Sequence, residues 1–406
     1  MENRIEMTQR DRDVLTVMRC VLRGERTQAE AAALLGVTAR QVRRIQRRLE
    51  SEGDAGVIHR LRGRPSNRQV DGDVRDQVLK VYQEELADFG PTLASQVLEE
   101  RGFVVSPETL RRWLLTAGLW NRQRRRDQHR SHRPRRQCFG ELIPIDASIH
   151  PWLEGRGEEM VLVTMIDDAT NRMLSRFYEG ETVEAYFDLV SRWLAKYGRP
   201  MAFYWDRDSI FETTCQGERI QGTTQFGRAM SELGIELILA QSPQAKGRVE
   251  RSHETCQDRW VKLLRLAGVA TRAGANELVD HRLLPDHNRR FTRAATSPND
   301  AHRPLGPRHN VAAILSIQEA RIVDNDDTVR FQNRRYQLHK PALRGLRRGR
   351  VIREQRLNGS LAIRFGDRYL TYSDLGALPL SPDTRFDRVI PTPSLIASVQ
   401  EVSIVV

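Results

Sequence analysis

Three carboxylates that are far apart in the chain each lie at the edge of a predicted secondary-structure element. Asp146 and Asp206 each follow a short apolar run typical of a β-strand, and Glu250 lies in the first turn of a predicted helix. Strand ends that meet at one edge of an open sheet would bring such side chains together. Three adjacent carboxylates need a countercharge, and hard oxygen ligands suit Mg²⁺ or Mn²⁺. Two such ions about 4 Å apart can activate an attacking oxygen and stabilise the leaving oxygen of a phosphodiester, without a protein nucleophile.

Each of these acids also has an ordinary structural interpretation. An aspartate after a strand is often a turn former, and a glutamate in a first helical turn often only complements the helix dipole. The joint pattern of three acids favours chemistry over these alternatives. Among nearby acids, Asp167 and Asp168 follow a buried strand and are expected to hold the turn into Asn171. Glu254 lies one turn after Glu250 and is the alternative third ligand.

The elements that must position the acids begin near residue 140, where charges become rare inside strand-like runs. Strands are predicted at 142–145, 160–166 and 173–178, followed by a helix at 182–194 and a strand at 201–205. A helix at 224–233, a strand at 235–240 and a helix at about 247–266 complete the order. Three antiparallel strands followed by alternating helices and strands imply a mixed sheet covered by helices. This is the element order of a ribonuclease H-like fold. Glu250 lies beside the apolar stripe of the last helix and can face the sheet.

The first sixty residues carry the signals of a helix-turn-helix unit. Thr8 is an N-cap candidate for a first helix, and the segment Thr27-Gln28-Ala29-Glu30 forms a capping-box pattern at the start of a second. Gly36 supplies a tight turn, and Thr38 caps a third helix whose outer faces are rich in arginine. A short Ala-rich helix, a glycine turn and an Arg-rich helix are typical of a DNA-reading unit. The alternative is an ordinary three-helix bundle with a solvated basic face.

Further basic segments and helices separate this unit from the sheet. Arg60–Pro65 contains Arg-Gly-Arg-Pro, which is similar to the core of a minor-groove AT-hook, and the alternative is a solvated linker. Apolar spacing then predicts three helices, around residues 74–81, 91–100 and 107–114. Residues 121–136 carry eight arginines against one acid, so they mark a domain boundary. A phosphate backbone is the expected neutralising partner of this segment.

The C-terminal part is predicted to be a small β module. Short strands are expected at 320–323, 328–331, 335–338, 351–357, 361–365 and 369–372, with a tight hairpin at Asn358-Gly359. Such strands can close into an SH3-like barrel. The module carries clustered arginines with Glu354 as the nearby acid, which favours binding to a DNA backbone, and these are Arg344, Arg347, Arg348, Arg350, Arg353 and Arg356.

The overall composition excludes several classes of protein. The chain has 406 residues, of which 65 are basic and 53 acidic, so the formal net charge is +12. Only five of the basic residues are lysine, for which a GC-rich genome is one interpretation, but that interpretation does not account for the net charge. The charge indicates a polyanionic partner, most often nucleic acid. The sequence contains no apolar run of about 18 residues, so no membrane span is predicted. Its first residues lack the apolar core of a signal peptide. The four cysteines form no CxxC pair, so a reduced, cytosolic compartment fits best.

Four motifs resemble a known family, the bacterial insertion-sequence transposases with an integrase-type catalytic core. The first acid motif corresponds to Ile145-Asp146-Ala147-Ser148, His150 and Trp152-Leu153-Glu154-Gly155, and the hairpin after it to Ile166-Asp167-Asp168-Ala169-Thr170. The second and third motifs correspond to Tyr204–Phe211 and to Ser242–Arg251, of which the third is the most specific. The resemblance covers roughly residues 10–370 and is closest to the ISNCY type. Small departures from the family pattern occur at Ala147, Pro151 and Asp208.

This resemblance implies a DDE transposase with Asp146, Asp206 and Glu250 as its catalytic, metal-binding triad. Such an enzyme uses two Mg²⁺ ions, for which Mn²⁺ can substitute. Water cuts a DNA strand to leave a 3′-hydroxyl, and that hydroxyl attacks target DNA by transesterification. The implied partners are double-stranded DNA at the element ends and at the target, with a homodimer or higher oligomer on DNA and no membrane. The implied location is the bacterial cytoplasm, associated with the nucleoid when bound to DNA. The alternatives are a structure-selective nuclease with the same core and a non-catalytic DNA-binding regulator.

The sequence therefore predicts a multidomain chain with all-α helix-turn-helix units, an α/β ribonuclease H-like mixed sheet and a small all-β barrel. The expected boundaries are 1–62 for the helix-turn-helix domain, 63–120 for a second one, 121–138 for a basic linker, 139–305 for the catalytic core, 306–375 for the barrel and 376–406 for a tail. The side chains expected to contact DNA are Arg40, Arg43, Arg44, Arg47, Arg62, Arg64, Arg111, Arg112, Arg124, Arg125, Lys246, Arg248 and Arg251. The last three surround Glu250 at a helix start, where phosphate binding is favoured.

Overall fold

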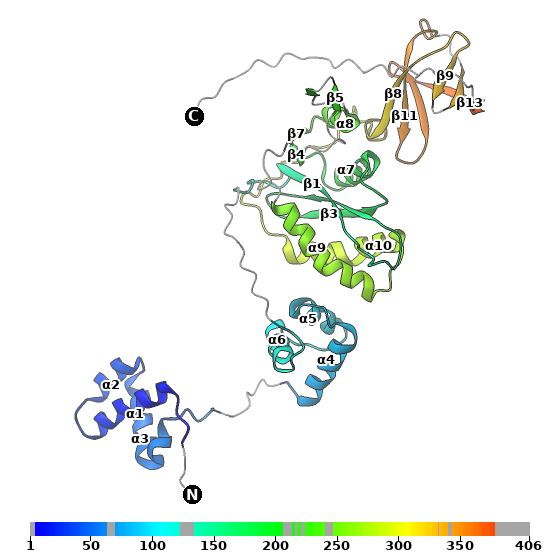
Figure 1. Cartoon of the computed structure of the whole chain (residues 1–406). Coiled ribbons are helices and arrows are strands. Elements are labelled where there is room, and N and C mark those ends of the chain that lie inside the picture. The colour runs from blue at the N-terminus through cyan, green and yellow to red at the C-terminus, as the bar shows by residue number, and fades with distance from the viewer. Residues whose placement is uncertain are drawn as a thin grey trace. The chain divides into compact units, whose positions relative to one another are not determined.

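The computed structural model describes residues 5–62, 70–121, 134–205, 213–215, 218–220, 224–239, 247–331, 333–339 and 343–377. The chain divides into two compact units, Met1–Asn121 and Arg122–Val406 (Figure 1). None of the helices in these described ranges combines the length and the apolar character needed to cross a bilayer.

The first unit begins with the predicted three helices. They are α1 (Gln9–Leu22), α2 (Gln28–Leu35) and α3 (Ala39–Glu52), followed by the 3-10 turn η1 (Gly53–Val57). Each helix starts with a capping box, formed by Thr8 with Asp11, Thr27 with Glu30, and Thr38 with Gln41. These reciprocal hydrogen bonds satisfy backbone donors that a helix start leaves unpaired, which is why short-range signals located all three starts correctly. Gly36, with φ of 64°, ends α2 and supplies the predicted turn.

The first unit also contains the second predicted set of helices, α4 (Gly72–Glu85), α5 (Pro91–Glu100) and α6 (Pro107–Thr116). Proline is well placed at the start of α5 and α6 because the first helical residue needs no backbone donor. The side chain of Ser106 caps α6 as expected, by accepting a hydrogen bond from the backbone of Thr109. The Tyr82 hydroxyl donates to the Phe89 carbonyl at 2.9 Å, which ties α4 to the turn before α5.

The second unit is built on a five-stranded mixed sheet with strand order β3-β2-β1-β4-β7. Its strands are β1 (Leu142–Ile149), β2 (Val161–Ile166), β3 (Met173–Tyr178), β4 (Ala202–Trp205) and β7 (Glu236–Leu239). The first three strands are antiparallel, and β4 and β7 extend the sheet in parallel with β1. The helices α7 (Val183–Tyr197), α8 (Gln225–Leu233) and α9 (Gly247–Leu266) complete the predicted order. This confirms the ribonuclease H-like fold.

The two faces of the sheet are covered by different helices (Figure 1). Ile143 and Ile145 of β1 belong to the core that α7 and α8 build on one face. On the other face, Phe177 of β3 packs against Trp260 of α9, with ring centroids 6.4 Å apart. Further helices follow on this side, namely α10 (Arg272–Leu278), the π-helical turn η3 (Val279–Leu283) and α11 (Leu284–Phe291). Side chains alternate along a strand, so Asp146 and Ser148 of β1 face α9.

The structure corrects the sequence prediction at two places in this sheet. The strand β1 does not end before Asp146 but continues to Ile149, because Asp146 to Ile149 pair with Thr164 to Val161 of β2. Asp146 therefore lies inside a strand rather than at its end. A small hairpin, β5 (Thr213–Cys215) with β6 (Glu218–Ile220), was not expected from the sequence. Its segments are too short to produce a recognisable alternating pattern.

A six-stranded antiparallel half-barrel follows the short helix α12 (Val311–Ile314). Its strands are β8 (Ser316–Ile322), β9 (Thr328–Phe331), β10 (Arg334–His339), β11 (Arg350–Arg356), β12 (Leu361–Phe365) and β13 (Arg368–Ala377), in the order β8-β11-β12-β13-β10-β9. All six predicted strands are confirmed. The module is attached to the sheet domain through α8, where Arg228 donates to the Ser316 carbonyl at 2.7 Å and Gln225 exchanges two hydrogen bonds with Gln318.

Candidate active site and DNA-contacting residues

The contact between α9 and β1 joins the helix that carries Glu250 to the strand that carries Asp146. His253 Nδ1 of α9 lies 3.5 Å from Asp146 Oδ2 of β1. One turn further on, Gln257 Nε2 donates to Ser148 Oγ at 2.9 Å. Glu250 precedes His253 by three residues, so the two side chains occupy the same helical face. The helix therefore directs the Glu250 turn toward the strand that carries Asp146.

Burial distinguishes the members of this cluster. The His253 side chain is 7% exposed and the Asp146 side chain 22%, whereas Glu250 is an exposed residue. Val249, immediately before Glu250, is fully buried and anchors the start of α9. An acid that remains accessible beside an anchored helix start can take a ligand from solvent without rearrangement of the core. The site is thus open on the Glu250 side and closed on the His253 side.

The third predicted acid, Asp206, lies outside the described residues. The described part of β4 ends at Trp205, and β4 runs parallel to β1 with Pro144 opposite Tyr204. Asp146 and Asp206 are each two positions beyond this last described pair. Within the described parts of the chain, no group of three or more His, Cys, Asp or Glu side chains is arranged to hold a metal ion.

Sequence reasoning missed the roles of His253 and Gln257. Their spacing from Glu250, three and seven residues, places all three on one helical face, and this signal was available from the sequence alone. The sequence could not indicate which strand that face would meet. Trp152 and Trp205 lie in the core, each 1% exposed.

The Asp167–Asn171 turn has the structural role that the sequence predicted. Asp167 accepts hydrogen bonds from the Gly140 backbone at 2.9 Å and from the Thr170 backbone and hydroxyl at 2.7 Å each. Burial raises the pKa of Asp167, and these hydrogen bonds oppose that shift. Asp168, also buried, accepts from the Arg136 backbone at 2.7 Å and forms an ion pair with Arg248. The two aspartates therefore join the turn to the segment before β1 and to the start of α9.

The predicted DNA-contacting arginines fall into contrasting environments. All four on α3, Arg40, Arg43, Arg44 and Arg47, are exposed, as are Arg112 of α6 and Arg251 of α9. Others contact acids of the protein itself: Arg62 lies 2.6 Å from Asp11, Arg111 lies 2.6 Å from Glu108, and Arg248 pairs with Asp168. Arg64, Arg124, Arg125 and Lys246 lie outside the described residues. For the whole set, contact with DNA stays a prediction.

In the β module, four of the six clustered arginines make side-chain contacts within the protein. Arg347 binds both carboxylate oxygens of Asp327 at 3.0 Å, and Arg356 lies 3.4 Å from the buried Glu354. Arg353 is itself buried, with its guanidinium carbon 3.0 Å from the centroid of the Phe331 ring. Arg348 Nε donates to Asn325 Oδ1 at 3.1 Å. These four side chains have partners within the module, so the expectation that the whole cluster faces DNA was too broad.

The chain is similar to helix-turn-helix family models and to proteins named as transposases. Residues 15–66 match a family model described as a helix-turn-helix domain, and residues 41–114 match a homeodomain-like domain. Over 373 residues the chain is 39% identical to "Putative transposase y4bF" of Sinorhizobium fredii (strain NBRC 101917 / NGR234), covering 91% of this chain and 81% of that protein. Over 369 residues it is 27% identical to "Transposase for insertion sequence IS1202" of Streptococcus pneumoniae, covering 79% and 76%.

Among solved structures, the HTLV-2 integrase catalytic core domain in complex with magnesium aligns with 34% of this chain and 82% of its own length. The sequence identity is 14% and the TM-score 0.27. The strand order and pairing of the sheet, rather than this similarity, establish the fold of the second unit.

Proposed function

The chain belongs to the transposase family, and we propose that it cuts and rejoins DNA at a site formed by Asp146, Asp206 and Glu250. The observation that carries this proposal is the contact of His253 with Asp146, since it brings the Glu250 turn of α9 to β1. Asp206, the proposed third acid, is the next residue after Trp205, where the described part of β4 ends, and consecutive Cα atoms are about 3.8 Å apart.

The donor set suits hard divalent cations. Asp146 and Glu250 contribute carboxylate oxygens, the ligand type that Mg²⁺ and Mn²⁺ prefer, and Asp206 would add a third carboxylate. Two Mg²⁺ ions held by these residues, with Mn²⁺ as a substitute, would supply charge stabilisation for the attacking and leaving oxygens. The residues of the chain hold the site in place: His253 and Gln257 fix α9 against β1, and Val249 anchors the helix start.

The proposed reaction has two phosphoryl-transfer steps. In the first, a water oxygen bonds to phosphorus at the element end, the bond from phosphorus to the 3′ oxygen breaks, and a 3′-hydroxyl is released. In the second, that 3′ oxygen bonds to a phosphorus of target DNA, and the target strand's own 3′ oxygen leaves as a hydroxyl. No protein nucleophile takes part, so the chain contributes positioning and charge.

The helical units would bind the element ends, and DNA contacts that span two ends require a homodimer or a higher oligomer on DNA. The substrates are double-stranded DNA at the element ends and at the target. We place this activity in the bacterial cytoplasm, at the nucleoid when the protein is bound to DNA.

The test is strand joining on DNA that flanks the gene, with and without Mg²⁺. Asp146→Asn and Glu250→Gln should each reduce joining by at least about 10³-fold, because each removes a charged ligand that acts in the transition state. DNA binding without metal should be unchanged in both variants. Joining by the Asp146→Asn protein at the wild-type rate would disprove the proposal.

Glu254→Gln is the matched control, because Glu254 is also an exposed glutamate of α9, one turn further on. It should join DNA at the wild-type rate. Loss of joining in Glu254→Gln but not in Glu250→Gln would assign the third acid to Glu254. Cleavage without joining in the wild-type protein would favour a structure-selective nuclease, and metal-independent binding without either reaction would favour a regulator.

A further inference from the structure

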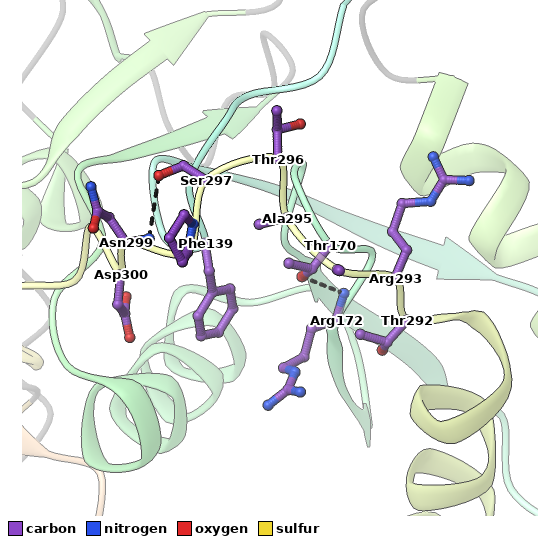
Figure 2. Close-up of a pocket in the computed structure, with 12 residues that line it drawn as sticks. Phe139, Thr170, Arg172, Thr292, Arg293, Ala295, Thr296, Ser297, Asn299 and Asp300 are labelled. Carbon is purple, nitrogen blue, oxygen red and sulfur yellow. Dashed lines mark hydrogen bonds between the residues drawn. The ribbon is translucent and has the colours of Figure 1, made fainter.

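A cavity of about 570 Å³ lies beside the Asp167–Asn171 turn, and no role has yet been assigned to it. Its wall combines Thr170 of the turn, Arg172 directly after it, Phe139 of the segment before β1, and residues 292–300, which follow α11 (Figure 2). This volume is in the range that accommodates a small organic group the size of a nucleoside.

The wall is fixed by hydrogen bonds between distant parts of the chain. The Arg293 backbone donates to the Thr170 carbonyl at 2.8 Å, the Ser297 backbone to the Gln137 carbonyl at 3.0 Å, and the Ala301 backbone to the Phe139 carbonyl at 2.8 Å. The Phe139 ring is backed by His302, with ring centroids 4.6 Å apart. The cavity is therefore a preformed feature of the fold.

The charge at the cavity is positive. Arg172 and Arg293 are exposed, and neither has a carboxylate partner among the described residues, whereas Asp300 is paired with His302 at 2.6 Å. In Figure 2 the side chains of Arg172 and Arg293 extend away from each other, so they flank the cavity instead of meeting inside it. Burial lowers the pKa of the neighbouring Arg135, and Arg293 adds to that shift by repulsion. The Arg172 guanidinium carbon lies 5.5 Å from the centroid of the Phe139 ring. Exposed guanidinium groups without a carboxylate partner, as in Arg172 and Arg293, favour an anionic partner.

The remaining lining fits a sugar or base between two phosphates. Phe139, Ala295 and Pro298 provide apolar surface. The Thr292 hydroxyl is buried and has no hydrogen-bond partner among the described residues, so one polar group of the wall is unsatisfied. Arginine and threonine side chains are common contacts of the DNA backbone.

The cavity is connected to the candidate active site through α9. Arg248, two residues before Glu250, pairs with Asp168, and Asp168 belongs to the same turn as Thr170, which lines the cavity. The start of α9 and the cavity therefore share the Asp167–Asn171 turn.

We propose that this cavity holds one nucleotide unit of the DNA strand next to the site of cutting, with the two flanking phosphates on Arg172 and Arg293. The nucleoside between them lies against Phe139, Ala295 and Pro298. This inference rests on the proposed function for the identity of the strand, but it concerns binding alone and needs no metal.

The experiment is a neutral-linkage scan of the full-length protein on duplex DNA from the gene's flanks. One phosphate at a time is replaced by an uncharged methylphosphonate, and the dissociation constant is measured without metal. In the wild-type protein, two neighbouring linkages on one strand should each weaken binding about 3–10-fold when neutralised. In Arg172→Ala and in Arg293→Ala, neutralising one of these two linkages should no longer weaken binding. Each variant should also reduce the slope of log affinity against log salt concentration by about one unit.

Arg308→Ala is the matched control, because Arg308 is an exposed arginine that follows the same segment and does not line the cavity. It should keep the wild-type linkage profile. Ala295→Phe, which fills the cavity without changing charge, should weaken binding while the melting temperature stays within a few degrees of wild type. Inorganic phosphate at constant ionic strength should not displace the DNA.

Three outcomes would overturn the inference: wild-type linkage profiles in both Arg172→Ala and Arg293→Ala, an unaffected Ala295→Phe, or displacement of DNA by inorganic phosphate, which would indicate a site for a free anion. The fate of the proposed function is independent of these results. If Asp146→Asn joins DNA while Arg172 and Arg293 still couple to neighbouring phosphates, the catalytic proposal fails and the binding inference stands.

Discussion

The arginines of α3 and the arginines around the central sheet differ in what their guanidinium groups contact. Arg40, Arg43, Arg44 and Arg47 of α3 are exposed, and no acid within the described residues forms an ion pair with them. Around the sheet, arginines are tied to the protein: Arg248 to the buried Asp168, Arg228 to backbone carbonyls of α12 and β8, and Arg259 to Asp286 at 3.8 Å. The α3 arginines are thus predicted to serve DNA recognition, whereas Arg248, Arg228 and Arg259 have partners within the protein.

This difference shows that arginine content alone does not locate a DNA-binding surface. An exposed guanidinium group with no protein partner keeps its full charge for a phosphate, whereas one that neutralises a buried acid has to break that ion pair first. Variants of the two regions should therefore fail in different ways. Variants of the α3 arginines should bind DNA more weakly, and variants of the paired arginines around the sheet should be less stable to unfolding.

The largest effect is expected on α3. Replacing Arg40, Arg43, Arg44 and Arg47 together by alanine should weaken binding to gene-flanking DNA by about 10²–10³-fold at physiological salt. The slope of log affinity against log salt should fall by up to about four units, one for each phosphate that an arginine no longer neutralises.

The melting temperature of the quadruple variant serves as its control. It should match that of the wild type, because these exposed side chains neither cap the helix nor pack in its core, which Val42 and Leu49 occupy. An unchanged salt slope would mean that α3 is an ordinary bundle helix with a solvated basic face.

The next effect contrasts two arginines of the same helix, α9. Arg248→Met should destabilise the second unit by about 3 kcal/mol, because it removes the ion pair that Arg248 forms with the buried Asp168 carboxylate. Arg251→Ala, at an exposed position three residues on, should leave stability unchanged and lower the salt slope of DNA binding by about one unit. Denaturant unfolding and salt titrations of binding measure the two quantities separately.

A rescue variant sharpens this contrast. Adding Asp168→Asn to Arg248→Met removes the carboxylate charge and should restore part of the stability. If Arg248→Met is as stable as the wild type and instead shows a smaller salt slope of DNA binding, the distinction between α3 and the sheet region fails at this residue.

The sequence could predict features that depend on neighbouring residues, but not those that depend on contacts between distant parts of the chain. The starts of α1, α2 and α3 were predictable because each capping box lies within four consecutive residues. The strand β1 was predicted too short because its last residues hold their place by pairing with β2, not by an apolar run of their own. The acids Asp146 and Glu250 were identified from motifs, but the contact of His253 with Asp146 depends on how α9 lies across the sheet. The pairing of Arg248 with Asp168, 80 residues apart in the chain, depends on the same packing.

The smallest effect is expected on α6, which combines both kinds of arginine on one short helix. Arg111 lies 2.6 Å from Glu108, three residues earlier, whereas Arg112 is exposed and forms no ion pair with a described residue. Arg112→Ala should therefore weaken DNA binding by several-fold and Arg111→Ala by less than about twofold. Glu108→Ala, which frees Arg111, should strengthen binding by about twofold.

Because an exposed ion pair of this kind contributes little to stability, the three variants should share the wild-type melting temperature, and the binding differences then reflect charge alone. A larger reduction in affinity for Arg111→Ala than for Arg112→Ala would show that pairing with a surface acid does not remove an arginine from DNA binding.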